Sequence, residues 1–210
     1  MSHPSQASAL LFGICTLLAG LGGCATTPGK PAPPATVPQA EAEAPERSLA
    51  ELERACTAGS LEDCYQLGVR YWEGIGVEKD DGRAAPLFDK VCRADDARGC
   101  TNLGILHVQG SGVELDDSQA VMLFEKACSL GASRGCTNLG ALYAEGRGVE
   151  QDDSRAAQIF EKSCAEGEAG ACFNLGLFYK QGRGVDANPE RAAELFHQAC
   201  QGGMDRACGR

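Results

Sequence analysis

The chain has 210 residues, twelve cysteines and a formal net charge of −10. This length is enough for one domain of ordinary size and a tail. The acidic balance argues against a nucleic-acid partner, because phosphate binding needs clustered Lys and Arg side chains. Twelve cysteines indicate metal sites in a reducing compartment and disulfides in an oxidising one. Their interpretation therefore depends on whether the chain is exported.

Residues 1–23 have the pattern of a signal peptide. The uncharged stretch from Ala9 to Leu21 is shorter than the roughly 20 residues that cross a bilayer, and it has the length of a signal-peptide hydrophobic region. It runs into Leu21-Gly22-Gly23-Cys24, which resembles the bacterial lipobox, although no Lys or Arg precedes it. The resemblance implies that Cys24 carries a lipid and becomes the first residue of the mature chain.

Residues 24–44, which follow the hydrophobic stretch, are rich in Pro, Ala and Thr. Such a composition cannot bury a core and favours an extended chain. We therefore expect a disordered tether that joins the lipid on Cys24 to a folded body, with this lipid as the only contact with a membrane. The prediction is a lipid-anchored protein of the bacterial cell envelope, on the outer-membrane, periplasmic or surface side, with secretion as the alternative.

The folded body is expected over residues 45–210, where the chain repeats itself every 36 residues. A leading helix at 45–56 precedes four repeats, at 56–91, 92–127, 128–163 and 164–199, and a stub at 200–210. A Leu-Gly pair, a Gly-x-Gly-Val turn and a Phe recur at fixed places in each repeat. A period of this length is typical of stacked supersecondary units.

Each repeat predicts two helices. In the third repeat, Leu139, Leu142 and Tyr143 have helical spacing, and Gly146 ends the helix because glycine tolerates a left-handed cap. Asp152 then starts a second helix as its N-cap. The equivalent starts are Asp80, Asp116 and Asn188. Pro86 conflicts with this pattern, because it falls inside the second helix of the first repeat.

The motifs Ala-x-Cys, Cys-x-Asn-Leu-Gly, Gly-x-Gly-Val and Ala-Ala-x-x-Phe together resemble the Sel1-like repeat, a relative of the tetratricopeptide repeat. The paired cysteines are similar to those of the cysteine-rich members of the family, such as the Helicobacter cysteine-rich proteins. The resemblance covers residues 45–210. It implies an all-α fold, a right-handed α/α superhelical solenoid of helical hairpins stapled by disulfides.

Ten cysteines of the body stand in five Cys-x7-Cys pairs, at Cys56–Cys64, Cys92–Cys100, Cys128–Cys136, Cys164–Cys172 and Cys200–Cys208. Each pair joins the end of one second helix to the opening of the next first helix. Such a corner can bring the Cα atoms within the roughly 4.4 to 6.8 Å that a disulfide needs. Zinc sites favour gaps of about two to four residues and four ligands together, so we expect no metal, and no cofactor.

The sequence contains no convincing active site. It lacks the Ser-x-x-Lys, His-Glu-x-x-His and phosphate-loop motifs. His107 stands where other repeats have Tyr71, Tyr143 and Tyr179, which favours a packed aromatic over a base. The resemblance nevertheless implies an alternative, because cysteine-rich Sel1-like proteins are often called β-lactamases and some are described as binding or slowly hydrolysing penicillins.

A row of side-chain amides is the candidate binding surface. It consists of Gln66, Asn102, Asn138 and Asn174, each one residue before a Leu-Gly pair. On a concave surface lined by the first helices, these amides could pair with an extended peptide or a cell-wall fragment; alternatively they support the hairpins by bonding nearby backbone. The hypothesis is a monomeric, lipid-anchored scaffold that binds a protein or peptide, with β-lactam binding or hydrolysis as the alternative.

Overall fold

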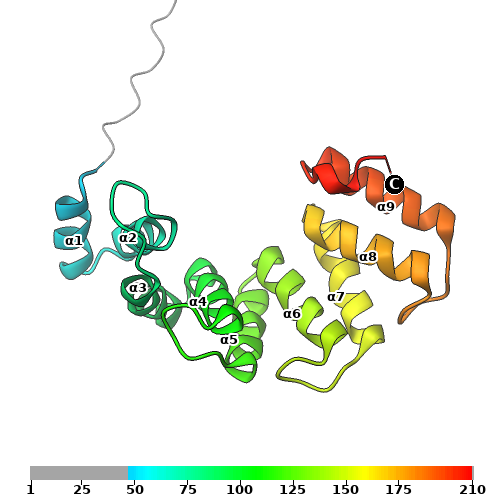
Figure 1. Ribbon diagram of the computed structural model, residues 1–210, viewed down its shortest axis with the longest axis horizontal. Helices are drawn as coiled ribbons and strands as arrows, with labels where there is room; N and C mark the ends of the chain where they lie inside the picture. The colour runs from blue at the N-terminus through cyan, green and yellow to red at the C-terminus, as the bar shows by residue number, and fades with distance from the viewer. Residues whose placement is uncertain (1–46, 210) are drawn as a thin grey trace, which may run out of the picture. The chain divides into compact units, whose positions relative to one another are not determined.

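The computed structural model describes residues 47–209, which fold into nine α-helices and a final turn of 3-10 helix (Figure 1). They are α1 (Leu49–Thr57), α2 (Leu61–Glu73), α3 (Asp81–Arg93), α4 (Ala97–Gln109), α5 (Asp117–Ser129), α6 (Ser133–Glu145), α7 (Asp153–Ala165), α8 (Ala169–Gln181), α9 (Pro189–Gln201) and η1 (Asp205–Ala207). The expected signal peptide, the lipidated Cys24 and the tether lie outside the described residues. None of the helices in the described part has the length and apolar character to cross a membrane.

After α1, first helices (α2, α4, α6, α8) alternate with second helices (α3, α5, α7, α9). Each helix packs on its neighbours in the sequence, and α4 also contacts α6, as α6 contacts α8. The hairpins therefore lie side by side, each burying an apolar face on the next (Figure 1). This confirms the predicted all-helical solenoid of stacked hairpins.

The second helices begin where the capping residues predict. The four N-caps each accept a hydrogen bond of 2.9 Å from the backbone N–H three residues later: Asp80, Asp116, Asp152 and Asn188. Each first helix ends at a glycine in the left-handed conformation, such as Gly146 with φ of 67°. Local chemistry therefore sets both ends of the hairpin turn.

Two details differ from a strict repeat. Helix α1 begins at Leu49, not at Pro45, because Ser48 and Glu51 form a capping box in which the Glu51 carboxylate accepts the Ser48 N–H at 2.8 Å. Ser48 has no counterpart in the later repeats, so the alignment could not show this start. Helix α3 continues through Pro86 and is 13 residues long, which is also the length of α5.

The core of each hairpin is a phenylalanine of the second helix packed on a glycine of the first. The four phenylalanines, each at most 3% exposed, are Phe88, Phe124, Phe160 and Phe196. A Cβ at Gly104 would lie 2.6 Å from Cε1 of Phe124, which is too close for any side chain. The glycine of the recurring Leu-Gly pair therefore lets the two helices of a hairpin approach closely.

Candidate binding site

Five disulfides connect the helices of the solenoid, and they are Cys56–Cys64, Cys92–Cys100, Cys128–Cys136, Cys164–Cys172 and Cys200–Cys208. Their Cα–Cα distances run from 4.5 to 5.0 Å. The first four join α1 or a second helix to the following first helix, and the last ties α9 to the segment after η1. Every cysteine of residues 47–209 is in this ladder, so the described part holds no free thiol. The ladder indicates an oxidising, extracytoplasmic compartment.

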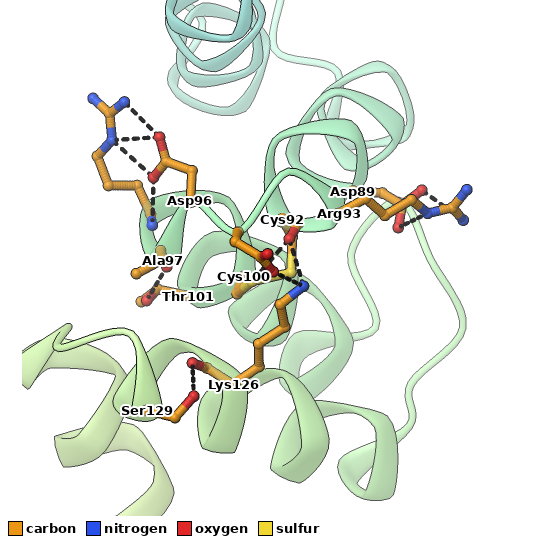
Figure 2. The surroundings of a disulfide bond; sticks show 11 residues. Asp89, Cys92, Arg93, Asp96, Ala97, Cys100, Thr101, Lys126 and Ser129 are labelled. Atoms are coloured by element: carbon orange, nitrogen blue, oxygen red, sulfur yellow. Dashed lines mark hydrogen bonds and ion pairs between the residues drawn. A yellow bond between two sulfur atoms is a disulfide. The ribbon is translucent and has the colours of Figure 1, made fainter.

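Lysines of the second helices reinforce this ladder. Figure 2 shows Lys126 of α5 reaching the Cys92–Cys100 disulfide, where its ammonium donates a 2.8 Å hydrogen bond to the Cys92 carbonyl oxygen. The same ammonium pairs with Asp95 at 2.8 Å. Lys90 makes the equivalent 2.7 Å hydrogen bond to the carbonyl oxygen of Cys56. A cation at the carboxyl end of a helix also complements the helix dipole. Through these hydrogen bonds, α3 is joined to α1 and α5 is joined to α3.

The row of amides divides into two groups. Gln66 is exposed and donates a 3.0 Å hydrogen bond to the Glu62 side chain, while Asn102 is only 4% exposed. Asn138 and Asn174 are half-buried, and each lines an open pocket. The Nδ2 atom of Asn138 is buried and has no hydrogen-bond partner within the described residues. Asn138 and Asn174, the two later members of the row expected from the sequence, therefore lie next to cavities, whereas Gln66 faces solvent and Asn102 is buried.

The two pockets are copies of one another. We call the first the 105–147 pocket, and its lining is Ile105, Val108, Gln109, Phe124, Asn138, Ala141, Leu142, Glu145 and Arg147. Adding 36 to each number gives the complete lining of the second, the 141–183 pocket. Their volumes are about 340 and 210 Å³. Each lies between two consecutive first helices above the buried phenylalanine of a second helix, so the repeat of the sequence becomes a repeat of cavities.

An arginine closes one side of each pocket. Arg147 donates from Nε and Nη2 to the two carboxylate oxygens of Asp117, at 3.0 and 2.7 Å, and from Nη2 to the Val108 carbonyl oxygen at 3.1 Å. Arg183 holds Asp153 in the same way, at 3.2 and 2.6 Å. Two-point pairing fixes the guanidinium plane, and the hydrogen bonds from Arg183 hold the pKa of Asp153 below its usual value.

The first hairpin has different side chains at the positions that line the two later pockets. Trp72 stands where the later repeats have Val108 and Ala144, and its ring lies edge-on to Phe88 with 6.1 Å between the centroids. Ser111 replaces the clamping arginine. The indole is thus packed against Phe88, and Asn102 on the next first helix is only 4% exposed.

Sequence reasoning missed the arginines and Glu145, which lines both pockets. The available signal was the Gly-Arg-Gly form of the third and fourth turns, where the first two turns have Ile or Ser between the glycines. Neither pocket could be found from this signal, because the partner of each arginine lies 30 residues earlier on another helix.

The two histidines of the described part contact their own helix or the turn after it. Nδ1 of His107 lies 3.2 Å from the carbonyl oxygen of Glu114, in the turn that follows its helix. His197 is exposed, and its Nε2 lies 2.9 Å from Nε2 of Gln201. Within residues 47–209, no group of three His, Cys, Asp or Glu side chains could hold a metal ion.

The model of the Sel1 repeat matches residues 61–96, 97–131, 133–168 and 169–204. The chain belongs to the Sel1 repeat family. The family's boundaries begin each Sel1 repeat at a first helix, so a disulfide such as Cys92–Cys100 joins two consecutive repeats. No curated protein matches the chain.

Several solved structures are similar to these Sel1 repeats. A Sel1 repeat protein from Oxalobacter formigenes is 24% identical, with a TM-score of 0.73 over 76% of this chain and 63% of that one. A protective antigen present in uropathogenic Escherichia coli strains is 29% identical, with a TM-score of 0.68 over 76% of this chain and 34% of its own. The chain thus spans less than two thirds of these two relatives.

The expected similarity to the Helicobacter cysteine-rich proteins is confirmed. Cysteine rich protein B of Helicobacter pylori is 31% identical to this chain, with a TM-score of 0.51, and the match covers 62% of this chain and 94% of that one. The Sel1 repeats and the disulfide ladder therefore occur together here as the cysteine motifs predicted.

Proposed function

We propose that the protein is an exported, lipid-anchored scaffold of the bacterial envelope whose Sel1 repeats bind a protein partner. The binding surface is the first-helix face, which we define as the row of α4, α6 and α8 that carries the two pockets. The observation that supports this proposal most directly is the pair of matching cavities, because they present the same apolar floor, amide and arginine twice in succession. Repeated cavities of this kind suit a ligand that is itself extended.

The partner can be tested by crosslinking in intact cells. A photoreactive amino acid replaces Gln109, an exposed residue at the rim of the 105–147 pocket, or Gln158, an exposed residue of α7 outside both pockets, as the control. We expect a discrete crosslinked protein at position 109 and none at position 158. Equal crosslinking at both positions, or none at either, would contradict a partner on the first-helix face.

The lipid anchor is tested separately. The lipobox-like Leu21-Gly22-Gly23-Cys24 supports modification at Cys24, and the disulfides support an oxidising compartment for the body. We expect the natural protein to incorporate labelled palmitate and to fractionate with membranes, and the Cys24→Ser variant to do neither. A Cys24→Ser variant that is still labelled would refute the anchor and leave the scaffold proposal intact.

A further inference from the structure

We infer that the two pockets recognise one extended peptide segment, with two apolar side chains three residues apart and a Lys or Arg between them. This inference rests on the proposed function and specifies the chemistry of the partner. It depends on four features of the first-helix face, namely the spacing of the pockets, their apolar lining, the unpartnered amide of Asn138 and the charge of Glu145.

The spacing follows from helix packing. Both α4 and α8 contact α6, and packed helices lie about 8 to 10 Å apart. Equivalent points in the 105–147 and 141–183 pockets are therefore separated by about 10 Å. An extended chain advances about 3.3 Å per residue, so roughly three residues cover this distance. A polyproline-type conformation returns every third side chain to the same side, which places both apolar side chains towards the pockets.

The lining selects apolar side chains of unequal size. Phe124 and Phe160 form the two floors, and Ala141 contributes to both pockets. The 105–147 pocket has Leu142 where the other has Phe178, and it is larger, at about 340 against 210 Å³. Both volumes accept an aliphatic side chain, and we assign the larger one, leucine, to the larger pocket and valine to the smaller.

The amide of Asn138 provides a contact for the peptide backbone. Its Nδ2 has no partner within the described residues, although buried polar groups in folded proteins nearly always have one. Asn138 lines the 105–147 pocket, so a turn of its amide towards the pocket would give this nitrogen a partner without breaking a hydrogen bond that it already makes. A backbone carbonyl of a peptide lying across α6 would accept this hydrogen bond.

The charge between the pockets is negative. Arg147 and Arg183 are each neutralised by a two-point contact with Asp117 or Asp153. Glu145 lines both pockets, its side chain is 58% exposed, and its nearest cation is Nη1 of Arg147 at 3.7 Å. Two arginines against three carboxylates leave one negative charge at the junction, so a Lys or Arg between the two apolar side chains complements it.

The test uses the purified, oxidised full-length protein and a fluorescent peptide, Gly-Leu-Lys-Pro-Val-Gly, followed by anisotropy at low salt. A second peptide has Glu in place of Lys. In a third peptide, Val stands two positions after Leu and not three. We expect the peptide with Glu to bind about three-fold more weakly, which is the size of effect that an exposed charge pair gives. The peptide with the shorter spacing should also bind more weakly, because its two apolar side chains cannot enter both pockets. Equal binding of all three peptides overturns the inference.

Variants of the protein locate the contacts. We expect Asn138→Ala to weaken binding about five-fold, as for the loss of one hydrogen bond, and Glu145→Gln to abolish the preference for Lys over Glu. Gln66→Ala is the matched control, since Gln66 has the same place in the row but no first helix precedes its own. A loss in Gln66→Ala equal to that in Asn138→Ala, or an unchanged Lys preference in Glu145→Gln, overturns the inference.

The two proposals fail in different ways. If position 109 crosslinks to a protein but the peptide preferences are absent, the scaffold proposal stands and the peptide chemistry is wrong. If the crosslinked partner is a second copy of this chain, the inferred peptide ligand is also wrong. If no crosslink forms at position 109, the proposed function fails independently of the peptide result.

Discussion

Single glycines carry much of the geometry of this solenoid. The second glycine of each later turn lies against the start of the preceding second helix, and a Cβ at Gly148 would lie 2.3 Å from the carbonyl carbon and oxygen of Asp117. The equivalent glycine of the first turn, Gly76, has a similar φ of 69° but meets no atom within 4 Å. The same motif therefore has a packing role only where another hairpin precedes it.

This contrast predicts unequal effects of the same substitution. Gly76→Ala should lower the free energy of unfolding by about 1 to 2 kcal/mol, the cost of a left-handed alanine. Gly148→Ala should lower the free energy of unfolding by roughly 1 to 3 kcal/mol more than Gly76→Ala does, because the methyl group would overlap the Asp117 backbone. Urea denaturation measures both, and equal losses would contradict the close contact at Gly148.

A buried hydroxyl offers a stabilising substitution. Ser163 is 0% exposed, and its Oγ has no hydrogen-bond partner in the described part of the chain. The equivalent positions hold Val91, Ala127 and Ala199, none of which carries a polar group. Ser163→Ala should therefore raise the free energy of unfolding by about 1 kcal/mol, since an unsatisfied buried polar group is removed. Ser154→Ala, at an exposed position of α7, is the control, and a Ser163→Ala gain no larger than the control's would refute the argument.

Ionised side chains contribute to the stability of the turns. The hydrogen bonds from Arg183 lower the pKa of Asp153 in the folded state relative to the unfolded chain. A lowered carboxyl pKa stabilises the fold above the unfolded value of about 3.9, and this contribution is lost as the pH falls below it. We expect Asp153→Asn to make the stability less steeply dependent on pH below about pH 4. Thermal melts across this range should show no such change in the control Asp186→Asn, at an exposed position of the turn that holds Arg183.

At the scale of helices, the disulfides connect elements that also contact by packing. Cys92 and Cys100 close a loop of nine residues between α3 and α4. The chain-entropy model assigns such a closure about 2 to 3 kcal/mol. Cys92→Ser combined with Cys100→Ser should reduce the free energy of unfolding by this amount under oxidising conditions. Under reducing conditions the difference between variant and natural protein should largely vanish, and its persistence would indicate lost packing instead.

Helix ends were the most predictable elements. Asp116 and Gly146 act through backbone groups within a few residues, so their effects could be derived from local sequence. The start of α1 was not predictable from the repeat, since Ser48 and Glu51 form a cap that no later repeat uses. The amides of Asn102 and Asn138 are identical in sequence context, and only the helices around them make one buried and the other part of a pocket.

At the scale of the whole body, each hairpin packs mainly on its neighbours, as in other repeat proteins. Stability should therefore decrease from the middle of the stack towards its ends. In hydrogen exchange followed by mass spectrometry, we expect the amides of α5 and α6 to exchange more slowly than those of α1 and α9.

Removing a single disulfide extends this prediction. A variant without Cys200–Cys208 should lose protection chiefly in α9, while one without Cys128–Cys136 should lose it in α5 and α6. A uniform loss along all the described helices in both variants would show instead that the body unfolds as one unit.

The sequence by itself determined the period of the solenoid, its helices and the spacing of its cysteines, because these depend on caps, turns and contacts close along the chain. Tertiary structure alone decided where the two pockets of the first-helix face lie. The Trp72 ring lies edge-on to Phe88 in the first hairpin, whereas Val108 and Ala144 line pockets that also reach Phe124 and Phe160. The clamps between Arg147 and Asp117 and between Arg183 and Asp153 span 30 residues, a distance at which local sequence patterns carry no information about contact.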